Sequence, residues 1–378
     1  MAKQLRILIL MAKTGGGHSA TATAIKQALE ALYKDKVYIE IVDGLRDFAP
    51  FPISHLDVTY PWQLKLSTKG YGIAWKTLNN TKLASQFVNS VWPLVKNAAY
   101  KIVRKKFDVI VATHPAFVYP CLRARVELGK KVKFVSVVPD LGSSHATWCD
   151  SRTDLLLTPT QEAANEAIRH GVPKEKIKVT GLPLRAEFTK VKESKSVILK
   201  SMGLNPTKKT VLLMGGGDGN NKLYDLAKKI NSSKLVVQLI TVSGKNSKVL
   251  KKLNNLNWKV PHILFGFTQN IPQLMRASDI LITKGGPTTI AEALVMGLPT
   301  IIFDYIPNQE TKNVELSEKV GAGKLLKNTS SIIKTISTWT NNPKILPQMS
   351  KNALKNSDPK ASLKAAKEIY ELVSKQFI

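Results

Sequence analysis

Short apolar runs of strand length alternate with amphipathic stretches along most of the chain. The first series of apolar runs lies at 6–11, 37–42, 107–112, 133–138, 154–157 and 177–180. A second series lies at 210–214, 235–242, 262–265, 279–283 and 300–305. Strands that alternate with helices are typical of parallel sheets covered by helices on both faces. The pattern therefore predicts an α/β protein with two doubly wound parallel-sheet units in series.

Residues 181–209 separate the two series and are rich in lysine, serine and proline, without a strand pattern. A chain of 378 residues is too long for one compact core. We expect an N-terminal domain over 1–190, a C-terminal domain over 195–355, and a last segment, 356–378, that packs on one of the two domains. The apolar residues between Ala361 and Phe377 fall on one face of a helix, which supports that packing.

The chain is strongly basic, because 56 lysines and arginines against 27 acidic residues give a net charge of +29. The excess is spread over both halves, and it favours polyanions: nucleic acid, an anionic membrane surface or phosphate-bearing ligands. We expect no membrane-spanning helix, since no apolar stretch is long enough, and no signal peptide, since the first apolar run ends in a glycine turn. Cys121 and Cys149 form no CxxC pair, so a zinc site or a disulfide framework is not expected.

Residues 50–106 interrupt the alternation and hold Trp62, Trp75 and Trp92 among many lysines. Aromatic rings beside lysines are typical of a segment at a lipid headgroup boundary. The alternative is a set of helices whose aromatic side chains fill the core. We expect a peripheral protein on the cytoplasmic side of a membrane, with anionic membrane lipids as partners.

A glycine turn, GGGH at 15–18, follows the first predicted strand and precedes a helical stretch at 19–33. Such a turn exposes the N–H groups of a helix N-terminus to an anion or an oxygen-rich ligand. The G-x-G-x-x-A spacing at 15–20, with Asp43 after the next strand, also matches a dinucleotide fingerprint, so an NAD-dependent oxidoreductase is an alternative. His18 argues against it, because its imidazole points to the crevice that a pyrophosphate would fill. A histidine that only caps its own turn remains the alternative to a functional one.

Two further glycine turns follow strands in the second half, at 215–219 and at 284–287. In the latter, Pro287 is placed at a helix start, and Thr288 and Thr289 supply hydroxyl donors in the first turn, as in a phosphate-binding helix N-terminus. Glu292 lies one helical turn further on and is suited to the two hydroxyls of a ribose. An acid that complements the helix dipole in the first turn is the alternative.

After the last predicted strand, Gln309, Glu310 and Asn313 fall on one side of a helix start, and their amide and carboxylate groups suit sugar hydroxyls. Together with the glycine turns they predict a nucleotide-sugar site. The sequence contains no D-x-D pair, so we expect neither a metal nor another cofactor. The charge of a leaving diphosphate would then be met by helix N-termini and cations.

These motifs resemble those of the monogalactosyldiacylglycerol synthase and processive diacylglycerol glucosyltransferase family, which is related to the peptidoglycan lipid-precursor N-acetylglucosaminyltransferase. They include GGGH (15–18), THP (113–115), DLGSSHATW (140–148), LLMGGGDG (212–219), SGKN (243–246), ILITKGGPTTIAEAL (280–294) and YIPNQETKNV (305–314). The resemblance implies a GT-B fold, in which two Rossmann-like domains face each other across a cleft. It implies inverting transfer of galactose or glucose from a UDP-hexose to diacylglycerol at a membrane surface.

The resemblance also implies roles for single residues. His18 matches the catalytic base. The acceptor-binding positions are Gly16, Gly17, Asp140, His145 and Trp148. The donor-binding positions are Gly216, Gly217, Ser243, Gly244, Asn246, Phe267, Thr268, Gly285, Gly286, Pro287, Thr288, Thr289, Glu292, Gln309, Glu310 and Asn313.

The chain departs from the family motifs at Ser19, Pro139, Gly286, Thr288 and Asn308, which leaves the hexose and the lipid acceptor open. Transfer of N-acetylglucosamine to a polyprenyl-linked peptidoglycan precursor is therefore an alternative. A nucleic-acid-binding module rests on charge alone, because the sequence contains no named nucleic-acid motif. We expect no nucleic-acid partner.

Overall fold

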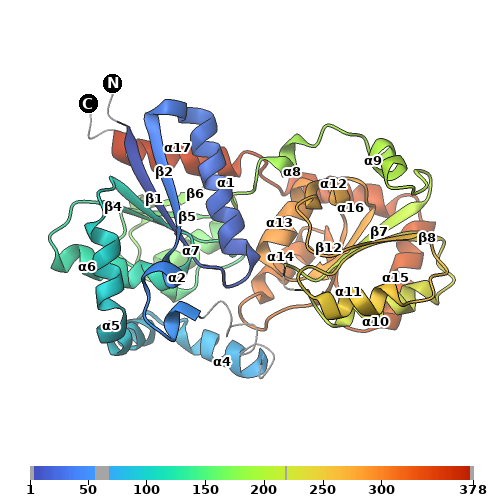
Figure 1. The fold of residues 1–378 in the computed structure, drawn as a ribbon, viewed down its shortest axis with the longest axis horizontal. Helices are drawn as coiled ribbons and strands as arrows, with labels where there is room; N and C mark the ends of the chain where they lie inside the picture. Colours follow the sequence, from blue (N-terminus) through green and yellow to red (C-terminus); the bar gives the residue numbers. More distant parts are fainter. Residues whose placement is uncertain (1–3, 56–67, 218, 375–378) are drawn as a thin grey trace. The chain divides into compact units, whose positions relative to one another are not determined.

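The computed structural model describes residues 4–55, 68–217 and 219–374. The chain forms two compact units (Figure 1). Unit 1 comprises Met1–Ala186, Pro307–Lys312 and Asp358–Ile378, and unit 2 comprises Glu187–Ile306 and Asn313–Ser357. Each unit holds a six-stranded sheet in which every neighbouring pair of strands is parallel. The predicted α/β class with two doubly wound units is confirmed.

The sheet of unit 1 has the strand order β2-β1-β3-β4-β5-β6. Its strands are β1 (Leu5–Met11), β2 (Val37–Asp43), β3 (Val109–Ala112), β4 (Lys133–Val137), β5 (Leu155–Thr158) and β6 (Ile177–Val179). From β1 the chain adds β2 on one side and β3 on the other, so the strand order reverses between β1 and β3. In open α/β sheets ligands bind at the carboxyl ends of the strands at such a switch point. For unit 1 this rule points to the loops that follow β1 and β3.

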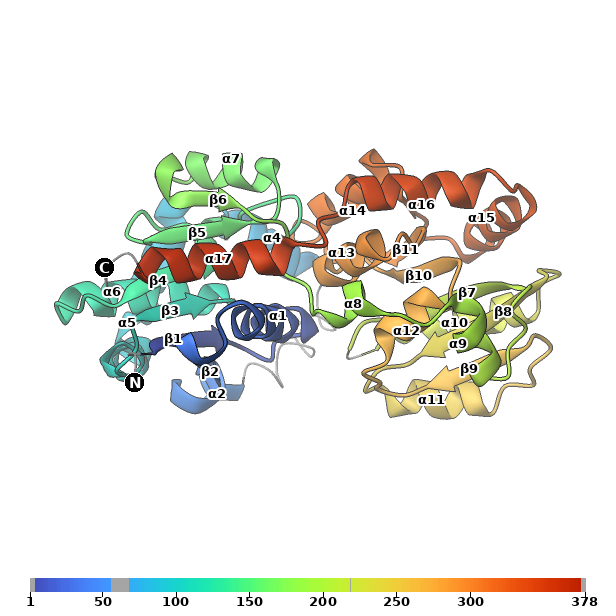
Figure 2. The same ribbon diagram turned by 90° about the horizontal axis from the view of Figure 1, so that it is seen from above.

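Helices cover both faces of this sheet, because successive residues of its strands point to opposite sides and both sides are apolar. Ile7 and Ile9 of β1 are fully buried on the face covered by α1 (Gly16–Tyr33) and α17 (Ala361–Ser374). Leu8 and Leu10 are buried on the other face, against α5 (Thr81–Arg104) and α6 (Val118–Glu127). Figure 2 shows α17 beside α1 over the strands. The last segment therefore belongs to the core of unit 1.

The remaining helices of unit 1 are short or lie outside these two layers. They are η1 (Lys34–Lys36), α2 (Gly44–Phe48), η2 (Ile53–His55), α4 (Thr68–Leu78), η3 (Pro115–Phe117), η4 (Ala146–Trp148), α7 (Gln161–Arg169) and η5 (Lys174–Lys176). No helix of the described residues is long and apolar enough to cross a membrane.

The sheet of unit 2 has the order β12-β11-β10-β7-β8-β9. Its strands are β7 (Lys209–Met214), β8 (Val237–Val242), β9 (His262–Phe265), β10 (Ile280–Lys284), β11 (Thr300–Asp304) and β12 (Gly323–Leu325). The order reverses between β7 and β10, and these are the strands that precede the two glycine turns of this half. The switch point of unit 2 therefore carries both turns. β12 lies outside the predicted strands, because its three residues, a glycine, an exposed lysine and a leucine, give no apolar run.

Unit 2 contains α8 (Glu187–Lys190), α9 (Lys195–Ser201), α10 (Lys222–Asn231), α11 (Ser247–Asn254), α12 (Ile271–Arg276), α13 (Pro287–Val295), α15 (Thr329–Asn341) and α16 (Ile345–Lys355). α14 (Thr311–Lys319) begins in the segment grouped with unit 1 and continues in unit 2.

The linker expected at 181–209 is wrong for most of its length. Phe188 of α8 and Ile198 and Leu199 of α9 are buried in the core of unit 2, and the division between the units falls after Ala186. α9 is seven residues long, which is too short for a helical period to stand out among lysines and serines.

The two tryptophans of the segment 50–106 that the structure describes, Trp75 and Trp92, are not among its exposed residues. Trp75 stacks on His145 with 3.9 Å between ring centroids, and Trp92 is 6% exposed with the Arg123 guanidinium 4.4 Å from its ring. Tyr60, Trp62 and Lys65 lie outside the described residues.

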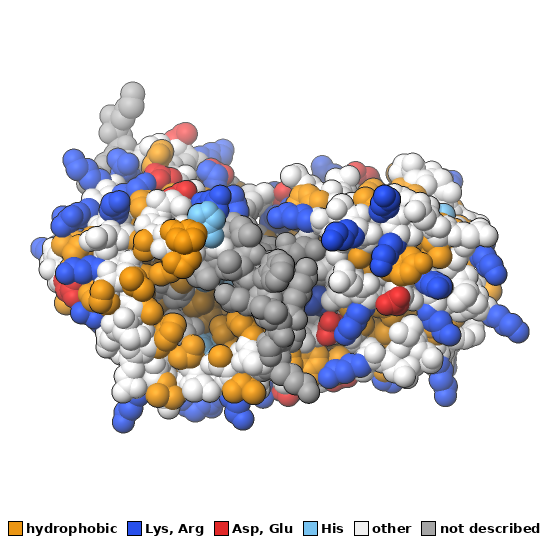
Figure 3. All heavy atoms as spheres, turned by 60° about the horizontal axis from the view of Figure 1, so that its bottom comes forward, with side chains coloured by type: hydrophobic (Ala, Val, Ile, Leu, Met, Phe, Trp, Pro, Cys, Tyr) orange, Lys and Arg blue, Asp and Glu red, His pale blue; other side chains and the backbone are white. Residues whose placement is uncertain are grey.

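The exposed apolar side chains on α4 and α5 are aliphatic or phenylalanine: Ile73, Leu83, Phe87 and Leu94. Figure 3 shows hydrophobic side chains gathered on the face of unit 1 that carries α4 and α5. We call these four residues the α4–α5 apolar surface.

Candidate active site

In unit 1 the glycine turn after β1 is itself the first turn of α1. The helix begins at Gly16 rather than near residue 19, so Gly16, Gly17 and His18 are its first three residues. Gly15 has a φ of 83°, a left-handed conformation that favours glycine, and as the N-cap it offers no side chain to the helix. The first N–H groups of α1 therefore lack a side-chain cap and are available to a ligand at the switch point.

The ring of His18 is fixed by the carbonyl oxygen of Thr113, which follows β3. The distance from His18 Nδ1 to that oxygen is 2.6 Å. Because a carbonyl only accepts, the ring proton lies on Nδ1, and Nε2 carries the free lone pair that a base needs. Burial lowers the pKa of His18 to about 4, although the hydrogen bond to Thr113 acts in the opposite direction. His18 is thus neutral at pH 7, as a general base must be.

Sequence reasoning noted the THP motif at 113–115 but gave His114 no role. The rings of His18 and His114 lie edge to face with their centroids 4.5 Å apart. His114 Nε2 lies 2.8 Å from Oγ1 of Thr14, in the turn that carries His18. Burial, followed by the neighbouring His18, lowers the pKa of His114 well below its usual value, so this ring is also neutral. The order β1-β3 in the sheet, which the sequence does not reveal, brings these loops together.

Two of the predicted acceptor-side residues, Asp140 and His145, have different surroundings. Asp140 is 6% exposed, and burial raises the pKa of its carboxyl group to about 7, with further contributions from Glu310 and Glu166. Both ring nitrogens of His145 are occupied: Nε2 donates to the Trp75 carbonyl oxygen at 2.8 Å, and Nδ1 accepts from the N–H of Thr147 at 3.2 Å. His145 therefore links α4 to the segment that follows β4.

Trp148 lies deeper, beside His18. Its side chain is 1% exposed, and its ring centroid is 6.2 Å from that of His18. Its indole Nε1 has no hydrogen-bond partner among the described residues. An unpaired buried N–H is costly. Trp148 thus adds an unused donor to the neighbourhood of His18.

In unit 2 the loops after β7 and β8 are locked together at the backbone. The Lys245 N–H donates to the Gly217 carbonyl oxygen at 2.9 Å. Gly244 has a φ of 61°, and a Cβ there would lie 2.4 Å from the same oxygen, so only glycine fits. By contrast, a Cβ on Gly216 or Gly217 would meet nothing within 4 Å. These two glycines therefore border open space, as expected beside a ligand.

The side chains around these loops join them to β11. Asn220 Nδ2 donates to a carboxylate oxygen of Asp304 at 3.3 Å, and Asn246 Nδ2 donates to Asn221 Oδ1 at 3.1 Å. Ser243 is buried, and its hydroxyl donates to the Phe265 carbonyl oxygen at 3.2 Å.

The loop after β10 leads into α13, whose first turn lacks a side-chain cap. Gly286 is the N-cap and Pro287 the first helical residue, as predicted. The Thr288 hydroxyl is buried and has no hydrogen-bond partner among the described residues, whereas Thr289 is partly exposed. An uncapped helix N-terminus with a spare hydroxyl is suited to a phosphate.

Two further residues, Asp304 and Asn313, hold this loop through Gly285. The Gly285 N–H donates to the Asp304 carbonyl oxygen at 2.8 Å, and Asn313 Nδ2 donates to the Gly285 carbonyl oxygen at 3.5 Å. Glu292 is 7% exposed and lies in the second turn of α13, so its interpretation as a first-turn acid is wrong.

The remaining predicted donor residues are Phe267, Thr268, Gln309 and Glu310. Phe267 is 61% exposed under the Lys245 ammonium group, and Thr268 Oγ1 accepts from the Asn270 N–H at 3.1 Å. Gln309 and Glu310 precede α14, which starts at Thr311, so the prediction that they share a helix face with Asn313 is wrong. They are grouped with unit 1, and Asn313 with unit 2. The turn is made by Asn308, whose φ of 65° ends the extended chain.

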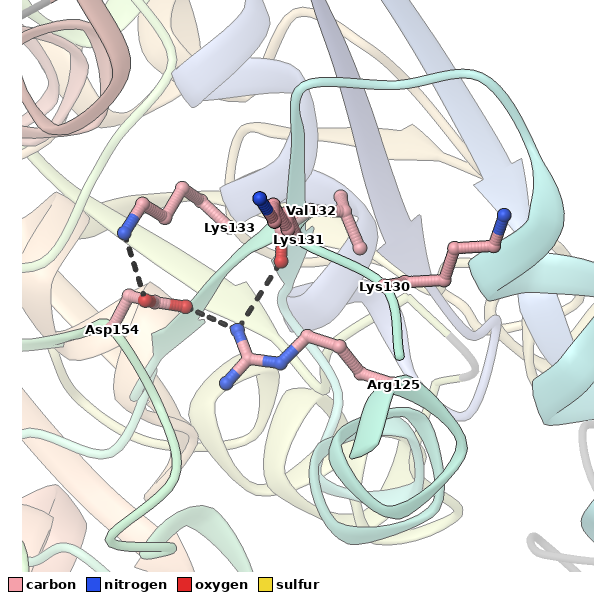
Figure 4. A pocket seen from close by; sticks show the side chains of 6 residues that line it. All are labelled: Arg125, Lys130, Lys131, Val132, Lys133 and Asp154. Carbon is pink, nitrogen blue, oxygen red and sulfur yellow. Dashed lines mark hydrogen bonds and ion pairs between the residues drawn. The ribbon is translucent and has the colours of Figure 1, made fainter. Parts of the chain in front are cut away.

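A basic hollow of about 520 Å³ lies at the opposite edge of the sheet of unit 1 (Figure 4). It is lined by Arg125, Lys130, Lys131, Val132, Lys133 and Asp154. Asp154 binds Arg125 and, at 3.3 Å, Lys133. β4 and β5 begin here, so the hollow lies at the amino ends of the strands, away from the switch point. None of the predicted site residues lines it.

Comparison with known proteins finds a family match for each half of the chain. Residues 18–184 match the monogalactosyldiacylglycerol (MGDG) synthase family, and residues 210–368 match the glycosyltransferase family 28 C-terminal domain. The chain is 34% identical to a probable chloroplastic monogalactosyldiacylglycerol synthase of Glycine max, over 98% of this chain and 72% of that protein. It is 35% identical to the chloroplastic enzyme of Spinacia oleracea, over 97% and 72%.

Solved structures share the fold at low identity. MurG of Acinetobacter baumannii has a TM-score of 0.59 at 13% identity, over 99% of this chain and 100% of that one. Anabaena Alr3699/HepE in complex with UDP-glucose has a TM-score of 0.58 at 16% identity, over 97% and 100%. The expected GT-B fold is therefore confirmed. The NAD alternative is not retained, and Asp43 instead caps α2 by accepting from the Arg46 N–H. By sequence along nearly its whole length, this chain belongs to the monogalactosyldiacylglycerol synthase family.

Proposed function

We propose that this protein transfers galactose from UDP-galactose to the free hydroxyl of diacylglycerol, with inversion at the anomeric carbon. The observation that carries the proposal is His18, a neutral imidazole whose Nδ1 is held by Thr113 and whose Nε2 is free, at an uncapped helix N-terminus. The galactosyl specificity rests on the relatives, which are named monogalactosyldiacylglycerol synthases.

In the proposed reaction the acceptor hydroxyl gives its proton to Nε2 of His18 as its oxygen bonds to the anomeric carbon. The bond from that carbon to the diphosphate oxygen breaks, and its electron pair leaves with UDP. We assign the diphosphate to the first turn of α13, where the N–H groups and the spare Thr288 hydroxyl meet the developing charge. Glu292 is assigned to the ribose, and Gly216 and Gly217 border the nucleotide.

The remaining donor assignments stay with this proposal. Ser243, Gly244 and Asn246 shape the loop beside the glycine turn, and Phe267 and Thr268 are assigned to the uracil. Gln309, Glu310 and Asn313 are assigned to the hexose. Gly16, Gly17, Asp140 and Trp148 are assigned to the acceptor side, whereas His145 acts there through α4. Among the described residues no three metal-ligating side chains are grouped.

We also propose that the α4–α5 apolar surface lies in the membrane that supplies the lipid. Leu83, Phe87 and Leu94 are spaced by four and seven residues, which places them on one side of α5. Their exposed fractions are 43%, 52% and 60%, which is unusual for large apolar side chains that gather together. The exposed lysines Lys76, Lys82 and Lys96 flank them, as expected at an anionic lipid surface.

The function is tested by incubating the protein with UDP-galactose, UDP-glucose or UDP-N-acetylglucosamine and diacylglycerol in anionic vesicles, followed by mass spectrometry of the lipids. We expect one added hexose from UDP-galactose. A polyprenyl diphosphate acceptor forms a further arm, and product only there would favour the peptidoglycan-precursor alternative.

The membrane surface is tested by co-sedimentation with anionic vesicles. Replacing both Phe87 and Leu94 by serine should abolish binding while leaving turnover of a detergent-dispersed acceptor. Val236→Ser, at a 79% exposed valine of unit 2, is the matched control and should bind like the wild type. Equal sedimentation of all three proteins would refute this surface.

A further inference from the structure

A second side chain in the glycine turn, Thr14, is held in place next to His18. The Ala116 N–H donates to His114 Nδ1 at 3.2 Å, so the proton of this neutral ring lies on Nε2. That Nε2–H therefore donates to Thr14 Oγ1, 2.8 Å away. His114 thus makes an edge-to-face contact with the base through its ring and holds Thr14 through its nitrogen.

This arrangement leaves the proton of the Thr14 hydroxyl unused. The hydroxyl oxygen accepts from His114, so its own O–H points elsewhere, and the described residues provide no acceptor for it. Thr14 is partly exposed, and a Cβ added at the neighbouring Gly15 or Gly16 would meet nothing within 4 Å. The turn therefore borders open space and carries both a hydroxyl donor and the lone pair of His18 Nε2.

The chemistry of the proposed acceptor decides what the Thr14 donor can bind. The attacking hydroxyl gives its proton to His18, and its oxygen needs a lone pair for the anomeric carbon, so a strong donor on that oxygen would oppose the attack. The nearest other oxygens of a diacylglycerol that accept strongly are the ester carbonyls, close to the free hydroxyl. An ether-linked glycerolipid lacks these carbonyls.

We propose that Thr14 binds an ester carbonyl of the acceptor, with His114 as its positioning residue, and that this contact makes the enzyme prefer acyl over alkyl glycerolipids. The inference rests on the proposed function and names an acceptor contact that the function itself does not require. Its alternative is a hydrogen bond that only braces the turn.

The experiment compares diacylglycerol with dialkylglycerol as acceptors in mixed micelles for the wild type, Thr14→Val, Thr14→Ser and His114→Phe. One hydrogen bond between neutral groups corresponds to roughly a threefold to tenfold change in kcat/KM. We expect the wild type and Thr14→Ser to prefer the diacyl lipid by about this factor. Thr14→Val and His114→Phe should lose the preference by losing activity on the diacyl lipid alone, with the KM for UDP-galactose unchanged.

The outcomes separate the two hypotheses. An acyl preference that survives in Thr14→Val overturns the inference, as does an equal loss on both lipids accompanied by a lower melting temperature, which identifies a brace. A wild type that glycosylates neither lipid with any UDP-hexose overturns the proposed function instead. Thr14→Ser keeps the hydroxyl, so it tests the contact even where valine impairs folding.

Discussion

Replacing Gly16 by alanine should separate the stability of the protein from its activity. Gly16 is the first residue of α1, its φ is not in the left-handed region, and a Cβ there would meet nothing within 4 Å. Neither backbone strain nor packing therefore requires glycine. Because alanine is the better helix former, the variant should be as stable as the wild type or more stable, by up to about 1 kcal/mol.

If a ligand binds at the N-terminus of α1, Gly16→Ala should lower the activity although it does not lower the stability. A methyl group at this position would displace the acceptor from the uncapped N–H groups and from His18. A misplacement of about 1 Å costs on the order of a hundredfold in rate. We therefore expect kcat/KM for diacylglycerol to fall by roughly tenfold to a hundredfold, while the KM for UDP-galactose stays constant because the candidate nucleotide loops belong to unit 2.

Gly129→Ala provides the matched control. A Cβ on Gly129 also meets nothing within 4 Å, but its φ is 58°, so alanine is strained there and should cost about 1 kcal/mol. Gly129 follows α6, far along the chain from the glycine turn, and its variant should melt earlier with normal kcat/KM. Thermal melts and initial rates on both variants form the assay. A stable Gly16→Ala protein with wild-type kinetics would refute a ligand at this helix N-terminus.

Three further predictions address other parts of the site. His18→Gln should lower turnover on the order of 10² to 10⁴ with the KM for UDP-galactose within a few-fold; near-native turnover would transfer the base assignment to Asp140. Glu292→Ala should weaken UDP binding by about 1.5–3 kcal/mol in calorimetry, the value of a hydrogen bond to a charged group; an unchanged Kd would remove Glu292 from the ribose. Burial lowers the pKa of His145 to about 4, so the unfolded chain binds a proton that the folded protein does not between pH 6.5 and 4, and stability from His145 is lost as the pH falls through this range. His145→Gln should therefore lose less stability than the wild type between pH 7 and 5 in urea melts, and parallel losses would contradict the assignment.

The sequence was sufficient for elements whose pattern is local. Apolar runs followed by glycine, proline or an amphipathic stretch predicted most strands to within a few residues, and Gly286-Pro287 predicted the start of α13. Glycine turns after strands also predicted which loops lie at the carboxyl edges, because that depends only on a strand being followed by a turn and a helix.

The sequence was insufficient where spatial neighbours decide the role of a residue. His114 could not be paired with His18, because the strand order that brings β3 beside β1 is set by packing. The sequence left open whether Trp75 and Trp92 lie at a lipid boundary or in the core, because composition does not show which ring stacks on His145 or lies under Arg123. The helix expected through Gln309 and Glu310 failed because Asn308 adopts a positive φ, and few non-glycine residues do so.

The position of α17 in the core of unit 1 sets an order for folding during synthesis. Ala365, Ala366 and Ile369 of α17 are fully buried, and α17 packs on α1, β4 and β5, whereas the ribosome makes all of unit 2 before it reaches them. Domains usually fold as they emerge. Here the N-terminal domain is made first, and the part of its sheet that α17 covers stays exposed until the second domain has been synthesised. A premature stop just before α17 would therefore leave unit 2 whole and make unit 1, with the proposed base, the target of chaperones and proteases.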